Sequence, residues 1–120
     1  MIVYTDGRPT KVAFQIEISG KVVASETVTI PFSTNFEAEY RSIIEALKYL
    51  SAPKQFRESV LLYNDNATVI SQILGKARIF EPRLKVLYDE VANYVASYKH
   101  KIQFEWIEKK GNKAHNLFER

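Results

Sequence analysis

The chain contains no cysteine, which excludes a disulfide scaffold, a thiolate zinc site and a cysteine nucleophile. It has no apolar run near the roughly 18 residues needed to span a bilayer, and no signal-peptide pattern at its start. Internal repeats, low-complexity segments and linkers are also missing. We therefore expect a cytoplasmic protein that forms one domain over residues 1–120 and does not enter a membrane.

The residues that are present favour an ordinary globular core. Hydrophobic residues make up 46% of the chain, which is enough for one core of this size. The net charge is only +3, and its positive excess lies in residues 51–120. A mildly basic second half is compatible with a polyanionic partner and equally with a solvated, lysine-rich surface.

The first thirty residues alternate in the manner of β-strands. Residues 2–7 predict a short strand that ends on Asp6 and breaks into a turn at Gly7. Residues 11–30 predict two further strands joined by a turn at Gly20. These three strands are expected to form an antiparallel meander.

A helix is predicted to follow the meander. Thr34 and Glu37 have the spacing of a capping box, in which each side chain binds the other residue's backbone N–H. Apolar residues then recur at helical spacing, which predicts an amphipathic helix over residues 35–50, closed by Pro53.

The second half adds two strands and three helices. The predicted elements are a strand over 59–63, a helix over 67–74 that stops at Gly75, a longer helix beginning at Pro82, a strand over 102–107 and a short final helix over 112–120. The apolar run at 59–63 is typical of a strand covered on both faces. The order β-β-β-α-β-α-α-β-α predicts an α/β fold, with a five-stranded mixed sheet of three antiparallel and then two parallel strands flanked by helices.

Three acids occupy comparable places in this order of elements. Asp6 ends the first strand, Asp65 follows the fourth, and Glu39 lies near the start of the first helix. If the first and fourth strands are neighbours, these carboxylates meet at one edge of the sheet. They would repel one another strongly unless a cation compensates them, and hard oxygen ligands favour magnesium or manganese over zinc.

Each acid also has a structural explanation when it is taken alone. Asp6 before glycine is typical of a turn, and Glu39 in a first helical turn can stabilise the helix dipole. Asp65 could cap the helix that follows it. The occurrence of all three acids in this order of elements favours a site.

Four segments together resemble the ribonuclease H type 1 family over nearly the whole chain. They are Tyr4-Thr5-Asp6-Gly7; Thr34-Asn35-Phe36-Glu37-Ala38-Glu39-Tyr40; Asn64-Asp65-Asn66 with Val69, Ile70, Gln72, Leu74 and Gly75; and Trp106-Ile107 with Asn112, Ala114 and Leu117. The start of the first helix is the most specific of them. Residues 76–85 are too short for the basic, aromatic handle of longer members, so the resemblance is to a compact form.

The resemblance implies a ribonuclease H-like fold and cleavage of the RNA strand of RNA–DNA hybrids. It implies that Asp6, Glu39 and Asp65 bind two divalent ions, Mg²⁺ or Mn²⁺, about 4 Å apart. In that mechanism one ion lowers the pKa of the attacking water and the other stabilises the leaving 3′ oxygen. The carboxylates would act as ligands and not as proton-transfer groups.

The fourth acid of the family's set has no counterpart here. Aligning Asn112 with the family pattern puts Asn116 at that position, whereas aligning Ala114 and Leu117, with one residue deleted, puts His115 there. We prefer His115, because this alignment keeps the apolar positions and supplies an imidazole. Either residue removes a negative charge from the site. Binding of the second metal ion is therefore expected to be weaker, and activity to be lower, manganese-dependent or absent.

The resemblance also suggests groups that contact a substrate. A hybrid would be read through its backbone and 2′-hydroxyls. The candidates are backbone N–H groups around Gly7 and Arg8, the side chains of Asn35 and Asn66, and the lysines Lys109, Lys110 and Lys113. Two other hypotheses stay open: a weakened module that binds nucleic acid or a protein partner, and a nuclease of the same fold acting on another nucleic acid.

Overall fold

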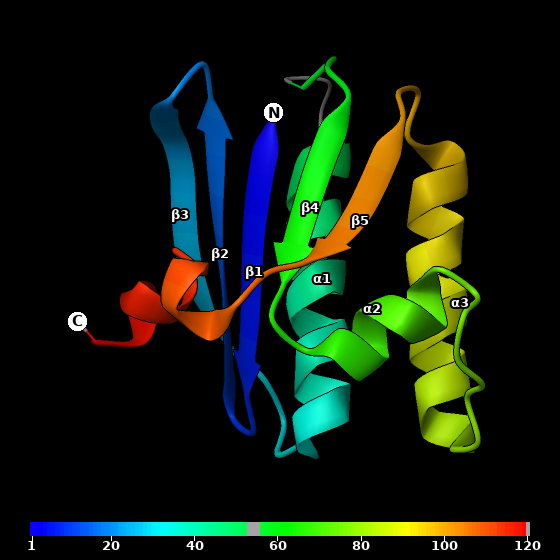
Figure 1. The fold of residues 1–120 in the computed structure, drawn as a ribbon. Coiled ribbons are helices and arrows are strands. Elements are labelled where there is room, and N and C mark those ends of the chain that lie inside the picture. Colours follow the sequence, from blue (N-terminus) through cyan, green and yellow to red (C-terminus); the bar gives the residue numbers. More distant parts are fainter. Residues whose placement is uncertain (53–55, 120) are drawn as a thin grey trace.

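The computed structural model describes residues 1–52 and 56–119. Within them the elements are β1 (Ile2–Arg8), β2 (Lys11–Ile18), β3 (Lys21–Thr29), α1 (Asn35–Ser51), β4 (Val60–Asn64), α2 (Ala67–Ile73), α3 (Pro82–Ser97), β5 (Ile102–Trp106), and the 3₁₀ turns η1 (Lys109–Gly111) and η2 (His115–Glu119). Figure 1 shows α1 behind the sheet, and the chain that carries η1 and η2 crossing in front of it. None of the helices in this described part is long and apolar enough to cross a membrane.

The five strands form one sheet in the order β3-β2-β1-β4-β5. The pairs β1–β2 and β2–β3 are antiparallel, whereas β1–β4 and β4–β5 are parallel. This confirms the predicted fold class. Thr5 of β1 lies opposite Asn64 of β4, so Asp6 and Asp65 follow directly after neighbouring positions at the same edge.

The larger core lies between the sheet and the helices α1 and α3. Val3 and Leu62 are fully buried there together with Ile43 of α1, and Leu87 of α3 completes the layer. The predicted capping box is confirmed, because Thr34 accepts from the Glu37 N–H and Glu37 accepts from the Thr34 N–H, both at 3.2 Å. Pro53, predicted to close this helix, lies outside the described residues.

The predicted final α-helix is wrong, because residues 109–119 form two 3₁₀ turns. His115 N donates to Asn112 O and Leu117 N donates to Ala114 O, both spanning three residues. Ala114 and Leu117 are buried against Tyr4 on the face of the sheet opposite α1. We call residues 109–118 the C-terminal segment.

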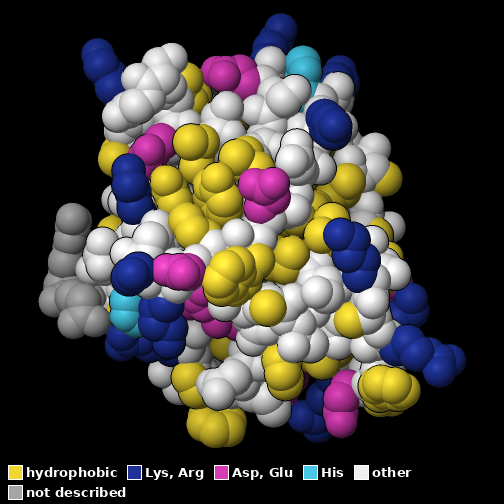
Figure 2. Space-filling model, viewed as in Figure 1, with side chains coloured by type: hydrophobic (Ala, Val, Ile, Leu, Met, Phe, Trp, Pro, Cys, Tyr) yellow, Lys and Arg dark blue, Asp and Glu magenta, His cyan; other side chains and the backbone are white. Residues whose placement is uncertain are grey.

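The C-terminal segment covers only part of this face. Leu61 and Tyr63 of β4 are half-buried, so the expectation that this strand is covered on both faces is wrong. Figure 2, drawn from this side, shows hydrophobic side chains gathered at the surface above the C-terminal segment. The face of β4 that points toward α1 is therefore fully buried, whereas the opposite face is only partly covered.

The first strand is longer than predicted and does not turn at Gly7. It continues to Arg8, with Gly7 paired to Val12 and Arg8 to Lys11. Glycine is required at position 7 for a different reason: a Cβ there would lie 2.3 Å from the carbonyl oxygen of Ala38. The missing side chain lets the start of α1 approach β1 closely.

Candidate functional site

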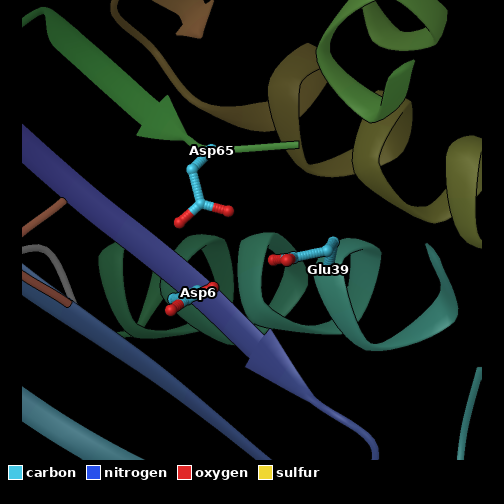
Figure 3. A group of neighbouring side chains, drawn as sticks. All are labelled: Asp6, Glu39 and Asp65. Atoms are coloured by element: carbon cyan, nitrogen blue, oxygen red, sulfur yellow. The ribbon is translucent and has the colours of Figure 1, made fainter. Parts of the chain in front are cut away.

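Asp6, Glu39 and Asp65 form one cluster at the edge of the sheet. Each offers a carboxylate oxygen, and these oxygens lie within 4.8 Å of one another. Figure 3 shows the three side chains pointing toward a common space from β1, α1 and the end of β4. The parallel pairing of β1 and β4 brings two of them together, and the close contact of α1 at Gly7 brings the third.

Asp6 is a buried strand residue and not a turn residue, since it is only 4% exposed and pairs with Ala13 of β2. Its Oδ1 accepts from the Gly7 N–H at 3.0 Å, and its Oδ2 lies 2.9 Å from His115 Nδ1. Burial and then the nearby Asp65 charge raise the pKa of Asp6, and the contact with His115 opposes this.

Glu39 is 7% exposed, so it is not the surface acid that the helix-dipole explanation requires. Its Oε1 accepts two hydrogen bonds, from the Gly7 N–H at 2.9 Å and from Asn64 Nδ2 at 3.0 Å. Burial, followed by repulsion from Asp6, raises the pKa of Glu39 to about 8. The charged form of this group is costly without a compensating cation.

Asp65 lies half-buried just beyond β4, and it does not cap α2. Asn66 performs that function, because its Oδ1 accepts from the Val69 N–H at 3.0 Å. Asp65 Oδ2 instead accepts from Asn112 Nδ2 at 3.0 Å, and the Asp65 carbonyl oxygen accepts from Trp106 Nε1 at 3.1 Å. The Asp65 carboxylate is therefore held toward the cluster.

The chemistry of this cluster suits a hard divalent cation. Its donors are all carboxylate oxygens, and burial together with mutual repulsion raises the pKa of Asp6 and of Glu39. In the described part of the chain no lysine or arginine forms an ion pair with the three acids, and His115 is their one potentially cationic partner. A bound Mg²⁺ or Mn²⁺ would supply the missing positive charge.

The cluster opens into a cleft of about 400 Å³. Its lining consists of Asp6, Gly7, Arg8, Pro9, Asn35, Glu39, Asp65, Asn66, Lys109 and His115. Most of the predicted site residues therefore meet here. Three do not line the cleft: Asn116 is exposed, Lys110 points into solvent, where its Nζ lies 3.7 Å from Glu108, and Lys113 pairs with Glu17 instead.

Two residues that support the acids were not predicted for that role. Asn64 is fully buried and Asn112 is 1% exposed, and each donates to one acid of the cluster. The sequence holds one signal for Asn64, which is a polar residue at the end of an otherwise apolar strand. Asn112 has no such local signal, because its partners are distant in the sequence.

Comparisons with known proteins agree with this geometry. A family model described as reverse transcriptase-like matches residues 17–118. No curated protein sequence matches. LC11-RNase H1, isolated from compost and solved in complex with RNA/DNA hybrid, is 24% identical with a TM-score of 0.86, over 97% of this chain and 91% of that chain.

Two further solved structures are similar over the same extent. RNase H1 from the halophilic archaeon Halobacterium salinarum is 21% identical with a TM-score of 0.87, over 97% of this chain and 91% of that chain. The N-terminal RNase H domain of a Mycobacterium tuberculosis protein is 23% identical with a TM-score of 0.83, over 97% of this chain and 92% of that chain. The resemblance to ribonuclease H type 1 is thus confirmed: the chain belongs to the reverse transcriptase-like family and carries an RNase H-like domain.

Proposed function

We propose that this chain is a metal-dependent endoribonuclease that cleaves the RNA strand of RNA–DNA hybrids. The observation that carries the proposal is the cluster of Asp6, Glu39 and Asp65, with ligand oxygens within 4.8 Å of one another, in a cleft of an RNase H-like fold. The similar LC11-RNase H1 was solved with an RNA/DNA hybrid, which supports the choice of substrate.

Asp6, Glu39 and Asp65 would hold the divalent ions. When bound, such ions lower the pKa of a coordinated water and stabilise negative charge on the leaving 3′ oxygen. The protein contributes by fixing the ligands in advance: Gly7 N–H donates to both Asp6 and Glu39, and this amide is therefore engaged by the acids and not open to a phosphate. The three carboxylates brought together in the folded chain would attract the ions electrostatically.

We assign His115, and not Asn116, to the fourth position of the site. His115 Nδ1 lies 2.9 Å from Asp6 Oδ2, and the imidazole lines the cleft, whereas Asn116 is exposed outside it. An imidazole cannot supply the negative charge of a fourth carboxylate. The proposed enzyme is accordingly expected to bind its ions less tightly than a four-acid site, with better activity in Mn²⁺ than in Mg²⁺.

The walls of the cleft offer polar groups to a nucleic-acid backbone. Asn35 and Lys109 are exposed on the lining, and Asn66 is half-buried there with its Oδ1 already used to cap α2. Arg8 also lines the cleft, and its guanidinium lies 4.3 Å from the centroid of the Phe118 ring. We propose that these side chains contact phosphate and sugar groups near the scissile bond.

A second candidate function is a module that binds nucleic acid without cleaving it efficiently. The observation that favours it is His115 in place of an acid beside Asp6. In this reading the carboxylate cluster would hold a cation too weakly for fast hydrolysis, while the cleft would still accept a nucleic-acid backbone.

One experiment separates the two candidates. The full chain and its Asp6→Asn variant are incubated with a labelled RNA–DNA hybrid, single-stranded RNA and duplex DNA, first in Mg²⁺ and then in Mn²⁺. Hybrid cleavage that disappears in the variant supports the nuclease. Hybrid binding without cleavage in either metal ion contradicts it and supports the binding module.

The same assay tests the fourth position. His115→Ala should lower hybrid cleavage, whereas Asn116→Ala should leave it close to that of the wild type. His115→Asp supplies the missing carboxylate and should increase cleavage in Mg²⁺. A loss confined to Asn116→Ala would reverse the assignment.

A further inference from the structure

Two buried asparagines each fix one oxygen of one acid. Asn64 is fully buried in β4 and donates from Nδ2 to Glu39 Oε1 at 3.0 Å. Asn112 is 1% exposed in the C-terminal segment and donates from Nδ2 to Asp65 Oδ2 at 3.0 Å. The two asparagines are far apart in the sequence, yet each makes the same kind of hydrogen bond to one of two neighbouring carboxylates.

The orientation of the Asn64 amide is set by its other partners. Its Oδ1 accepts from the Asn66 N–H at 2.8 Å, so the NH₂ group must face Glu39 and the Thr5 hydroxyl, 3.1 Å away. Reversing the amide would place an oxygen against the Glu39 carboxylate and leave the Asn66 N–H without an acceptor. The Asn64 NH₂ group is therefore oriented toward Glu39 without any bound ligand.

The Asn112 amide is oriented in the same way. Its Oδ1 accepts from the Ala114 N–H at 3.2 Å, and its Nδ2 donates to the Thr5 carbonyl oxygen at 2.8 Å as well as to Asp65. Asn64 Nδ2 also contacts that carbonyl oxygen, at 3.3 Å. Both amides therefore converge on the residue that precedes Asp6 in β1.

These contacts distinguish the two oxygens of each acid. Glu39 Oε1 accepts from both Asn64 and the Gly7 N–H, and within residues 1–52 and 56–119 no donor contacts Oε2. Asp65 Oδ2 accepts from Asn112, and again no described donor contacts Oδ1. In each carboxylate, one oxygen accepts hydrogen bonds from the protein, and the other oxygen is available to a ligand.

We propose that Asn64 and Asn112 are positioning residues that each fix one carboxylate oxygen and thereby direct Glu39 Oε2 and Asp65 Oδ1 toward a divalent cation. The inference rests on the proposed metal-dependent function. Asparagine suits this role because its amide orients a carboxylate without adding charge. A lysine or arginine would neutralise the acids and compete with the cation, and an apolar residue would leave Glu39 Oε1 or Asp65 Oδ2 with one donor fewer.

The test compares Asn64→Ala and Asn112→Ala with Gln72→Ala in the full chain. Gln72 is a matched control, since it is also a buried amide, 7% exposed, that bonds Tyr40 and the Arg78 carbonyl oxygen away from the cleft. Binding of Mn²⁺ is measured by titration calorimetry, and stability by urea unfolding without metal. Both asparagine variants should bind Mn²⁺ about 10–100-fold more weakly, while Gln72→Ala loses stability and binds as the wild type does.

A double-variant experiment tests the assignment of each asparagine to its acid. In a Glu39→Gln background, Asn64→Ala should weaken Mn²⁺ binding no further, whereas Asn112→Ala should still weaken it. If an alanine variant does not fold, the serine variant, which leaves a smaller cavity, replaces it with the same expectation.

The possible failures are distinguishable. If the wild type binds Mn²⁺ and both asparagine variants bind it equally well, the positioning inference is overturned and the proposed function stands. If the Gln72→Ala control weakens Mn²⁺ binding as much as they do, the effect is a general loss of stability and the inference is again overturned. A folded wild type that binds no Mn²⁺ overturns both.

Discussion

The acids and the groups that support them come from two differently built regions. Asp6, Glu39 and Asp65 lie on or directly beside regular elements whose packing forms the main core. His115 and Asn112 lie in the C-terminal segment, which contains only 3₁₀ turns and packs on the other face of the sheet. The regular region brings negative charges together, and the irregular region supplies groups that contact two of them.

This difference shows how the site tolerates its own repulsion. Strand pairing and the contact of α1 with β1 force the carboxylates together whatever their charge. The C-terminal segment adds neutral or potentially cationic partners from across the sheet, and it does so without an arginine or lysine on the acids among the described residues. The negative charge of the acids is therefore left without a lysine or arginine partner among these residues, while the carboxylates stay oriented.

The largest expected effect comes from removing an acid of the regular region. Asp6→Asn should reduce hybrid cleavage by more than about 100-fold, because even residues that only support a metal ligand typically contribute about 10–100-fold. The fold should survive, since the amide has nearly the shape of the carboxylate and relieves repulsion. Cleavage rates and urea unfolding measured on the same sample check both statements, and a variant with undiminished cleavage would remove Asp6 from the site.

The next effect comes from loosening the C-terminal segment. Leu117 is 7% exposed and packs with Tyr4 and Ala114, so Leu117→Ala should destabilise the protein by about 2–5 kcal/mol. Cleavage should fall as well, because the segment carries His115. Phe32→Ala, at an 84% exposed position, is the control and should change stability by less than about 0.5 kcal/mol. Equal stabilities for the two variants would show that the segment is not held by its apolar contacts.

Much of the regular region could be predicted from the sequence, but little of the C-terminal segment could. The apolar periodicities and the capping box at Thr34 are local signals, and they located the strands, α1 and the three acids. The extension of β1 through Gly7 was missed, because the need for glycine arises from the approach of α1. The partners of Asn112 lie at Thr5 and Asp65, so no local pattern could assign its role or the 3₁₀ form of its segment.

A smaller effect concerns pH in the absence of divalent ions. The pKa of Glu39 is raised from its ordinary value of 4.5 to about 8, so between these values the folded chain holds a proton that the unfolded chain has lost. The free energy of unfolding in EDTA should therefore fall as the pH rises from about 5 to about 8. Urea unfolding of the wild type and of Glu39→Gln measures this, and the variant should show the weaker dependence. An equally steep fall in both proteins would assign the pH dependence to other groups.

The smallest effect is expected at the edge of the C-terminal segment. Lys113 Nζ lies 2.9 Å from Glu17 Oε2, and this contact lowers the pKa of Glu17. Its stabilisation is present above the ordinary pKa of Glu17 and is lost as the pH falls through the lowered value. Because Lys113 is half exposed and solvent screens the contact, Lys113→Ala should lower the free energy of unfolding only slightly near neutral pH, measured by urea unfolding at low salt. A loss as large as that of Leu117→Ala would show that charge, and not apolar contact, holds the segment.

The central claim is tested most directly by the ends of the RNA fragments that the wild type produces from a hybrid in Mn²⁺. Attack by a water with loss of the 3′ oxygen should give fragments with 3′-hydroxyl and 5′-phosphate ends, from the hybrid and not from the same RNA strand alone. Asp6→Asn, prepared in parallel, should give none. Fragments ending in 2′,3′-cyclic phosphate, or equal cleavage by Asp6→Asn, would contradict the account.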